Sequence, residues 1–346
     1  MKRYAILGAV VVALGGGSVS AQGVSDALIR EAVATNKGEI ILHNALFDNL
    51  STAITNGFKA AYGAKGLSVK VVRSQSSQQV SIYEQELRAN KVSEDLLMFV
   101  DEGQFRNFAR AGKLTSYCSE NYKDFRPGAI GPDCTYLNVA AYYQYISYNP
   151  EMVKAADAPK AWADLLNPKW KGKISIPDPK VGGGHYYFVF TMFKLFGDEW
   201  FTKVRANDAL QTQSHGVTNN QILAGERLAG VNISVLARRD GPFPGGKGGP
   251  IQESFPAEGG ALLPASLAIT KGGPNLPGAK VFMEWASSLE GQKVINQLGH
   301  FSLRKDFTSV EGDDLSKIKY HAWDPDEMDA KREELTARSI RLLSGG

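Results

Sequence analysis

Residues 139–148 read Val-Ala-Ala-Tyr-Tyr-Gln-Tyr-Ile-Ser-Tyr, a long, uncharged and aromatic-rich stretch near the middle of the chain. Its pattern predicts an extended strand that crosses from one lobe of the protein to another. A second extended stretch, residues 260–270, would carry the chain back. Two crossings would make the lobes discontinuous in sequence and would join them by a hinge. Side-chain alternation puts Tyr143 and Tyr145 on one face, where they either wall a cleft or pack within the hinge.

Short apolar strands and amphipathic helices alternate on both sides of this crossing. Before it, strands are expected at residues 39–43, 67–72 and 96–100, and helices at residues 46–61, 80–89 and 104–111. After it, strands are expected at residues 173–176 and 231–236, and helices at residues 186–196 and 218–224. This order predicts βαβ units and a mostly parallel sheet in each half.

The length of 346 residues exceeds what one compact core usually holds, and 43% apolar residues exclude wholesale disorder. We therefore expect an α/β protein with two lobes, each a mainly parallel sheet flanked by helices, and a ligand cleft between the lobes. The expected division is a leader (1–21), a first lobe (22–146 plus about 262–305), a second lobe (147–261) and a helical tail packed on the lobes (306–346). Within that tail, residues 324–343 predict a charged amphipathic helix.

The first residues have the features of a secretory signal peptide. Lys2 and Arg3 precede an apolar run over residues 4–14, and Val19-Ser20-Ala21 provides small residues for cleavage after Ala21. The alternative is a membrane anchor, but about 20 apolar residues are needed to span a bilayer. We therefore expect a soluble periplasmic protein.

Charge and cysteine content limit the partners. With 39 basic and 36 acidic residues the formal charge is only +3, and removal of Lys2 and Arg3 leaves 37 − 36 = +1. This balance argues against a nucleic-acid partner, which needs a basic stripe.

Cys118 and Cys134 are the only cysteines, and an even count in an exported chain indicates one disulfide. Zinc is the weaker alternative, because two cysteines without a neighbouring histidine make a poor site.

Polar and glycine-rich loops follow several predicted strands, and ligands bind at the carboxyl ends of parallel strands in such folds. Taken singly, each loop could be no more than a helix cap. Four similar loops at strand-to-helix junctions, two from each half, would instead converge on one cleft. The candidate residues in these loops and in the later strand are Asn44, Ser76, Ser77, Asp101, Gly183, Gly184, His185, His215 and Asn232.

Several enzyme motifs are absent or incomplete. Residues 241–248 match a phosphate loop up to Lys247, but Gly248 stands where magnesium binding needs Ser or Thr. The sequence contains no Gly-x-Ser-x-Gly elbow and no His-Glu-x-x-His motif. We therefore expect no catalytic residues, no metal site and no cofactor, with an exported enzyme on the same fold as the alternative class.

Six segments resemble those of the type II periplasmic solute-binding proteins of ABC importers, and the likeness covers essentially the whole chain after the leader. They are Tyr-Asn-Pro (148–150), Asn-Pro-Lys-Trp-Lys-Gly-Lys (167–173), Phe-Pro-Ala-Glu-Gly-Gly (255–260), Ala-Ile-Thr-Lys-Gly-Gly-Pro-Asn (268–275), Ala-Lys-Val-Phe-Met-Glu-Trp (279–285) and Ser-Leu-Glu-Gly-Gln (288–292). The resemblance implies a monomer that captures a small solute and delivers it to a membrane permease. A membrane sensor is the alternative partner.

Within that family the chain looks most similar to the branch of ferric-ion, phosphonate and sugar-phosphate binders. Where ferric members carry iron ligands, this chain has Phe47, Asp101, Ser234 and Val235, so only the acid is kept. The resemblance places donors to an anion at Gly183, Gly184, His215 and Asn232, with Ser76 and Ser77 on the facing lobe. Glu258 and Asp101 would receive an amine or hydroxyls of the solute. The expected solute is a phosphate, phosphonate or carboxylate, and the alternatives are a ferric ion or complex and, less favoured, a polyamine.

Overall fold

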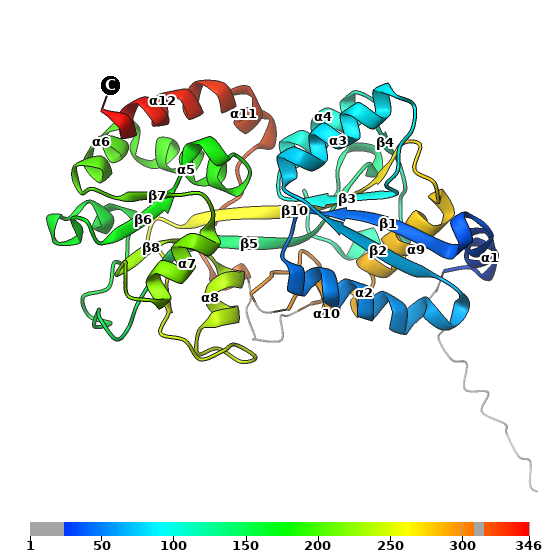
Figure 1. Ribbon diagram of the computed structural model, residues 1–346, viewed down its shortest axis with the longest axis horizontal. Coiled ribbons are helices and arrows are strands. Elements are labelled where there is room, and N and C mark those ends of the chain that lie inside the picture. The colour runs from blue at the N-terminus through cyan, green and yellow to red at the C-terminus, as the bar shows by residue number, and fades with distance from the viewer. Residues whose placement is uncertain (1–23, 298, 308–314, 346) are drawn as a thin grey trace, which may run out of the picture.

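One long mixed sheet with helices on both faces organises the computed structural model (Figure 1). The structure describes residues 24–297, 299–307 and 315–345, so the predicted leader lies outside the described residues. The strands are β1 (Glu39–Asn44), β2 (Ser68–Arg73), β3 (Leu96–Phe99), β4 (Leu114–Thr115), β5 (Leu137–Tyr148), β6 (Ile174–Pro177), β7 (Leu210–Thr212), β8 (Ala229–Ile233), β9 (Gln252–Ser254), β10 (Gly260–Thr270) and β11 (Tyr320–His321). The helices are α1 (Asp26–Ala34), α2 (Asp48–Tyr62), α3 (Ser76–Arg88), α4 (Glu102–Arg110), α5 (Gly184–Phe196), α6 (Asp198–Ala206), α7 (His215–Leu223), α8 (Ser234–Asp240), α9 (Leu276–Ser287), α10 (Leu289–Ile295), α11 (Pro325–Ala330) and α12 (Arg332–Ser344).

The strand order is β2-β1-β3-β10-β5-β8-β6-β7. Strand β1 pairs in parallel with β2 and β3, and β6 pairs in parallel with β7 and β8. Between these two parallel groups, β10 and β5 run antiparallel to each other and to their outer neighbours. Figure 1 shows these two strands running through the middle of the molecule, from one group of helices to the other. The predicted alternation of strands and helices and the two crossing strands are confirmed.

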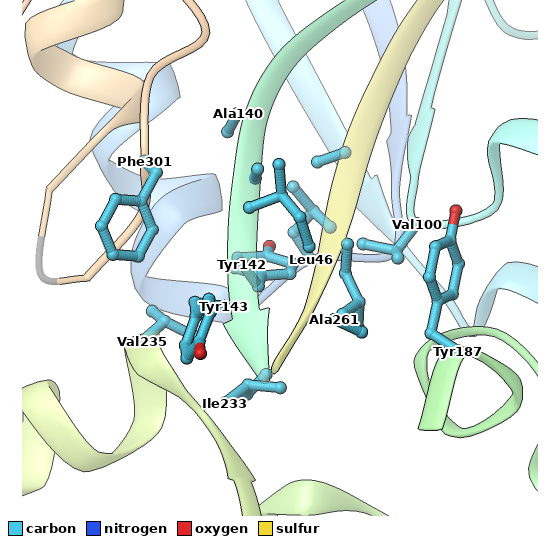
Figure 2. Packing of buried hydrophobic residues seen from close by; sticks show 14 of the residues in the cluster. Leu46, Val100, Ala140, Tyr142, Tyr143, Tyr187, Ile233, Val235, Ala261 and Phe301 are labelled. Carbon is cyan, nitrogen blue, oxygen red and sulfur yellow. The ribbon is translucent and has the colours of Figure 1, made fainter. Parts of the chain in front are cut away.

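All twelve residues of β5 are buried, as expected for a strand covered on both faces. Tyr143 and Tyr145 stack on each other with ring centroids 5.9 Å apart, and both contact Phe255. Tyr142, the residue before Tyr143, instead packs against Phe47 and His300. Figure 2 shows the rings of Tyr142 and Tyr143 leaving the strand in different directions.

The boundary between β8 and α8 differs from the prediction. A strand was expected over residues 231–236, but the strand ends at Ile233 and the helix begins at Ser234. Apolar residues fill both sides of this boundary, and a short apolar run does not distinguish a buried strand from a buried helix. The predicted tail helix is likewise two helices, α11 and α12, with Lys331 between them.

Helices α11 and α12 contact both groups of helices. Towards α4, Asp326 pairs with Arg106 at 3.3 Å, and Arg332 pairs with Asp101 at 2.8 Å. Towards α5 and α6, the ion pairs are Lys194 with Glu327 at 3.0 Å and Arg338 with Asp198 at 2.8 Å. In Figure 1, α11 lies above the space between α5 and α4. The tail therefore straps the two halves together on this side.

The predicted disulfide between Cys118 and Cys134 is formed. It closes the segment between β4 and β5, which contains two short 3-10 turns, Glu120–Asp124 and Pro132–Cys134. Across the described ranges, every helix is too short or too polar to cross a membrane.

Candidate functional site

The N-termini of α5 and α7 meet beside the hinge strand β5. Gly182 and Gly183 precede α5 with φ angles of +72° and +51°, a region that suits glycine. The backbone N–H groups of Gly182, Gly183 and Ser214 donate to no acceptor among the described residues. Ser214 caps α7 by accepting a hydrogen bond from the Val217 N–H at 3.2 Å. Two helix starts with uncommitted donors therefore lie next to each other.

Gln144, His185 and His215 form a buried polar group at this junction, called here the histidine cluster. The rings of His185 and His215 meet edge to face with centroids 4.6 Å apart. The Gln144 amide lies 3.0 Å from Nε2 of His215 and donates to the Gly184 carbonyl at 3.4 Å. Burial lowers the pKa of both histidines, that of His215 most strongly, so both rings are neutral near pH 7.

Asn232 lies deeper in the same half of the molecule. It is fully buried and donates to Asn219 of α7 at 2.9 Å, and Asn219 donates to Asp240 at 2.9 Å. The Asn232 carbonyl oxygen accepts from the Ile233 N–H at 2.9 Å. Asn232 thus supports the elements around the histidine cluster, and its own side chain is already hydrogen-bonded.

Loops from the other half face this junction. A Cβ atom added to Gly183 would lie 3.7 Å from the Val100 carbonyl oxygen at the end of β3, so the two halves approach each other here. Next to Val100, Asp101 caps α4 through the Gln104 N–H and binds Arg332. Asn44 is also fully used, because it donates to Ser51 and accepts from Leu46.

Ser76 and Ser77 start α3, and Ser77 is exposed. A shallow hollow of about 440 Å³ is lined by Ser77, Gln78, Ser81 and Ile82. The structure gives no contact between these serines and the histidine cluster, and their role as anion donors stays a prediction.

Two predicted residues are not brought to the cluster. The Tyr143 hydroxyl donates to the Lys319 carbonyl and accepts from the Gly260 N–H, so its polar atom is already committed. The Glu258 carboxylate accepts from the N–H groups of Trp162 and Ala163 at the start of the 3-10 turn Trp162–Leu166. Both residues serve the local structure where they stand.

Three residues at or next to this junction were not among the predicted site residues: Gln144, Tyr142 and His300. Tyr142 and Gln144 occupy the alternate positions of β5, so they lie on the opposite strand face from Tyr143 and Tyr145, which were the predicted residues. His300 follows α10 in an irregular segment and had no local signal. Its ring lies 5.0 Å from that of Tyr142.

The positions that match ferric-ion ligands carry other chemistry. Phe47 packs edge to face on Tyr142, and Val235 is buried in the core (Figure 2). Ser234 donates to the Gly299 carbonyl and accepts from the Tyr143 N–H. Throughout the described part of the chain, no group of three His, Cys, Asp or Glu side chains is arranged to hold a metal ion.

Known proteins share this architecture. The periplasmic binding protein AfuA from Actinobacillus pleuropneumoniae, solved with fructose-6-phosphate, is 22% identical and superposes with a TM-score of 0.77 over 89% of this chain and 99% of its own. Iron-bound HitA from Pseudomonas aeruginosa is 19% identical, with a TM-score of 0.75 over 88% of this chain and 99% of its own. These likenesses confirm the predicted two-lobed fold.

Sequence comparisons identify the family. An uncharacterized protein from Haemophilus influenzae is 30% identical over 145 residues, and the match spans 40% of this chain and 40% of that relative. The model of the family described as "Bacterial extracellular solute-binding protein" matches residues 92–331, which is more than half of the chain. The predicted resemblance is therefore confirmed, and the chain belongs to the bacterial extracellular solute-binding protein family.

Proposed function

We propose that this protein is the solute-binding component of an ABC import system and that it captures a small anionic solute at the N-termini of α5 and α7. The observation that carries the proposal is the meeting of these two helix starts beside β5, with uncommitted N–H groups at Gly182, Gly183 and Ser214. A phosphate, phosphonate or carboxylate group matches such donors.

The electrostatics of this junction favour an anion without a cationic side chain. Each helix N-terminus carries a partial positive charge, and its first N–H groups have no acceptor within the helix. Gly182 to Gly184 and Gly216 are partly exposed, so a solute can approach the backbone closely. His215 accepts the Gln144 amide at Nε2, so its Nδ1–H can be offered to the same oxygen atoms, whereas the Nδ1–H of His185 is donated to the Asp178 carbonyl. Recognition of the anion would thus depend on hydrogen-bond donors directed at it and not on a net positive charge of the protein.

The crossing strands supply the mechanism. Strands β5 and β10 link the two parallel groups, and the candidate site lies at the junction of these groups. Bending of the two strands would let the solute dock on α5 and α7 and would then close the β3–α4 loop over it. A closed, loaded molecule presents a shape that a membrane permease can recognise. Export to the periplasm with cleavage after Ala21, and action as a monomer, complete the proposal.

The structural neighbours support both an anionic solute and the alternative. AfuA was solved with fructose-6-phosphate, and HitA was solved with iron. In this chain the side chains at the iron-ligand positions other than Asp101 are Phe47, Ser234 and Val235, which are unsuited to ferric ion. The anion is therefore the proposal, and iron is an outcome of the test.

The test is calorimetric titration of the purified protein with inorganic phosphate, methylphosphonate, sugar phosphates, carboxylates, polyamines and ferric citrate. We expect binding by at least one anion class, weakened about tenfold or more by His215→Gln. Thr202→Ala, on the exposed surface of α6, is the matched control and should bind as the wild type does. Binding of ferric ion or polyamines alone would overturn the proposal, as would turnover of any phosphate ester.

A further inference from the structure

Two buried polar atoms near the histidine cluster have no hydrogen-bond partner among the described residues. They are the hydroxyl of Tyr142 and Nε2 of His300. The side chains are almost completely buried, with exposed fractions of 3% and 2%. Tyr143 and Tyr145, on the same strand, both have hydroxyl partners, at the Lys319 carbonyl and the Glu253 carboxylate. Burial of an unpaired polar atom is costly, so each such atom needs a partner, and these two belong to rings that lie only 5.0 Å apart.

The chemistry of the pair is fixed by its surroundings. Nδ1 of His300 lies 2.5 Å from the carbonyl oxygen of Gln297, and only an N–H can bond to that oxygen. The hydrogen is therefore on Nδ1, and Nε2 carries a lone pair. Burial also lowers the pKa of His300 to about 4, which keeps the ring neutral. The pair thus offers one acceptor, Nε2, and one hydroxyl that can donate.

The pair lies beside β5, close to the residue of that strand that contacts the histidine cluster. Tyr142 packs on Phe47, which precedes α2 just beyond the carboxyl end of β1. Gln144, two residues farther along β5, contacts His215 and the Gly184 carbonyl. Residues i and i+2 of a strand share a face and lie about 7 Å apart. A solute with its anionic group at the histidine cluster would have to span about 7 Å to reach Tyr142 and His300, which is roughly the five bonds between the phosphorus and a hydroxyl oxygen of a sugar phosphate.

We infer that Tyr142 and His300 form a second contact point of the solute site, which recognises a hydroxyl group carried by the anionic solute. A hydroxyl can donate to Nε2 of His300 and accept from the Tyr142 hydroxyl at the same time. An ammonium group has no lone pair to accept with, and the terminal oxygen atoms of a phosphate monoester dianion have no hydrogen to donate. The aromatic faces of Phe47 and Tyr142 would cover the carbon atoms next to the hydroxyl. The inference rests on the proposed function and narrows the solute to a hydroxylated anion.

The experiment compares three probes that differ in hydroxyl content: inorganic phosphate, n-propyl phosphate and fructose 6-phosphate. Affinities are measured by calorimetry for the wild type, Tyr142→Phe, His300→Phe and the control Tyr145→Phe. We expect Tyr142→Phe to weaken fructose 6-phosphate about tenfold and to leave inorganic phosphate and n-propyl phosphate within twofold. Tyr145→Phe, whose hydroxyl faces Glu253, should leave all three affinities within twofold.

The outcomes separate the inference from the proposed function. If the wild type binds none of the three phosphates and none of the carboxylates above, the proposed function fails and the inference fails with it. If fructose 6-phosphate binds the wild type and Tyr142→Phe equally well, only the inference fails, and the pair holds an internal water. A nitrogen NMR spectrum gives a second readout that does not depend on a variant's folding. The Nε2 resonance of His300 should shift on addition of fructose 6-phosphate and stay in place with inorganic phosphate.

Discussion

Replacement of Arg332 by Gln should loosen the association of the two halves of the molecule. Arg332 lies on α12, and its guanidinium donates to the Asp101 carboxylate at 2.8 Å, with the two side chains only 28% and 18% exposed. The guanidinium also lies over the Tyr186 ring of α5, with 4.7 Å from its carbon to the ring centroid. It therefore joins the start of α4 on one side to α5 on the other.

The magnitude follows from these contacts. A hydrogen bond to a charged group contributes about 1.5–3 kcal/mol when it is largely shielded from water. The cation–π contact adds about 0.5–1 kcal/mol. Gln can keep a weaker bond to Asp101, so we expect a net loss of about 2 kcal/mol. This corresponds to a change of roughly 30-fold in the equilibrium between a tail bound to both halves and a tail detached from one of them.

Arg338→Gln is the matched control. Arg338 is on the same helix and pairs with Asp198 of α6 at 2.8 Å, but both side chains are more than 40% exposed. A pair of this kind contributes about 0.2–1 kcal/mol. Urea unfolding gives the free-energy change for each variant, and small-angle X-ray scattering of the solute-free protein gives its radius of gyration. If both variants lose equal stability and neither expands the molecule, the strap does not hold the halves together.

Three further changes test other parts of the structure. Replacing both cysteines by Ser opens a disulfide that spans 16 residues, and urea unfolding should show a loss of about 3 kcal/mol; a loss below about 1 kcal/mol would mean that the segment is ordered without it. Burial lowers the pKa of His300 from 6.5 to about 4. Between pH 6.5 and about 4 the His300 ring is therefore protonated only in the unfolded chain, so stability falls as the pH drops, by up to about 1.4 kcal/mol per pH unit. Burial raises the pKa of Glu94 to about 7 and that of Asp95 to about 6, and these two shifts make stability rise as the pH drops. The measurement is therefore the difference in free energy of unfolding between the wild type and His300→Gln from pH 7 to pH 4. Parallel curves for the two proteins would contradict the lowered pKa of His300. Tyr142→Phe should raise the free energy of unfolding of the solute-free protein by about 1–3 kcal/mol because it removes an unpaired buried hydroxyl, whereas Tyr145→Phe should lower it; a decrease in both would mean that the Tyr142 hydroxyl has a water partner.

The architecture was predictable because its signals are local. Each strand-to-helix step leaves its own hydrophobic period in the sequence, and the carboxyl ends of parallel strands meet at one edge of a sheet. That rule brought together Gly183, Gly184, His185 and His215, which the structure places at the junction of α5 and α7.

The rest of the site depends on information that the local sequence does not carry. Both faces of β5 bear aromatic and polar side chains, so alternation alone does not say which face meets the helix starts; Tyr143 was chosen, whereas Gln144 makes the contact. His300 reaches Tyr142 only through the path of the chain after α10. The start of α8 at Ser234 was predicted wrongly for another reason. A short apolar run fits a strand or a helix equally well.

The cations near the candidate site also decide how salt should act on binding. Two arginines follow β8, and both are paired: Arg238 forms a buried ion pair with Glu253 at 2.7 Å, and Arg239 pairs with Asp240. If backbone N–H groups carry the recognition instead, the attraction acts over hydrogen-bond distances and is little screened by ions. The dissociation constant of the anion should then change less than about threefold between 0.05 and 0.5 M sodium chloride. A weakening of tenfold or more would show that an exposed cation, such as Lys180 in the loop before α5, supplies the attraction that we assign to the helix starts.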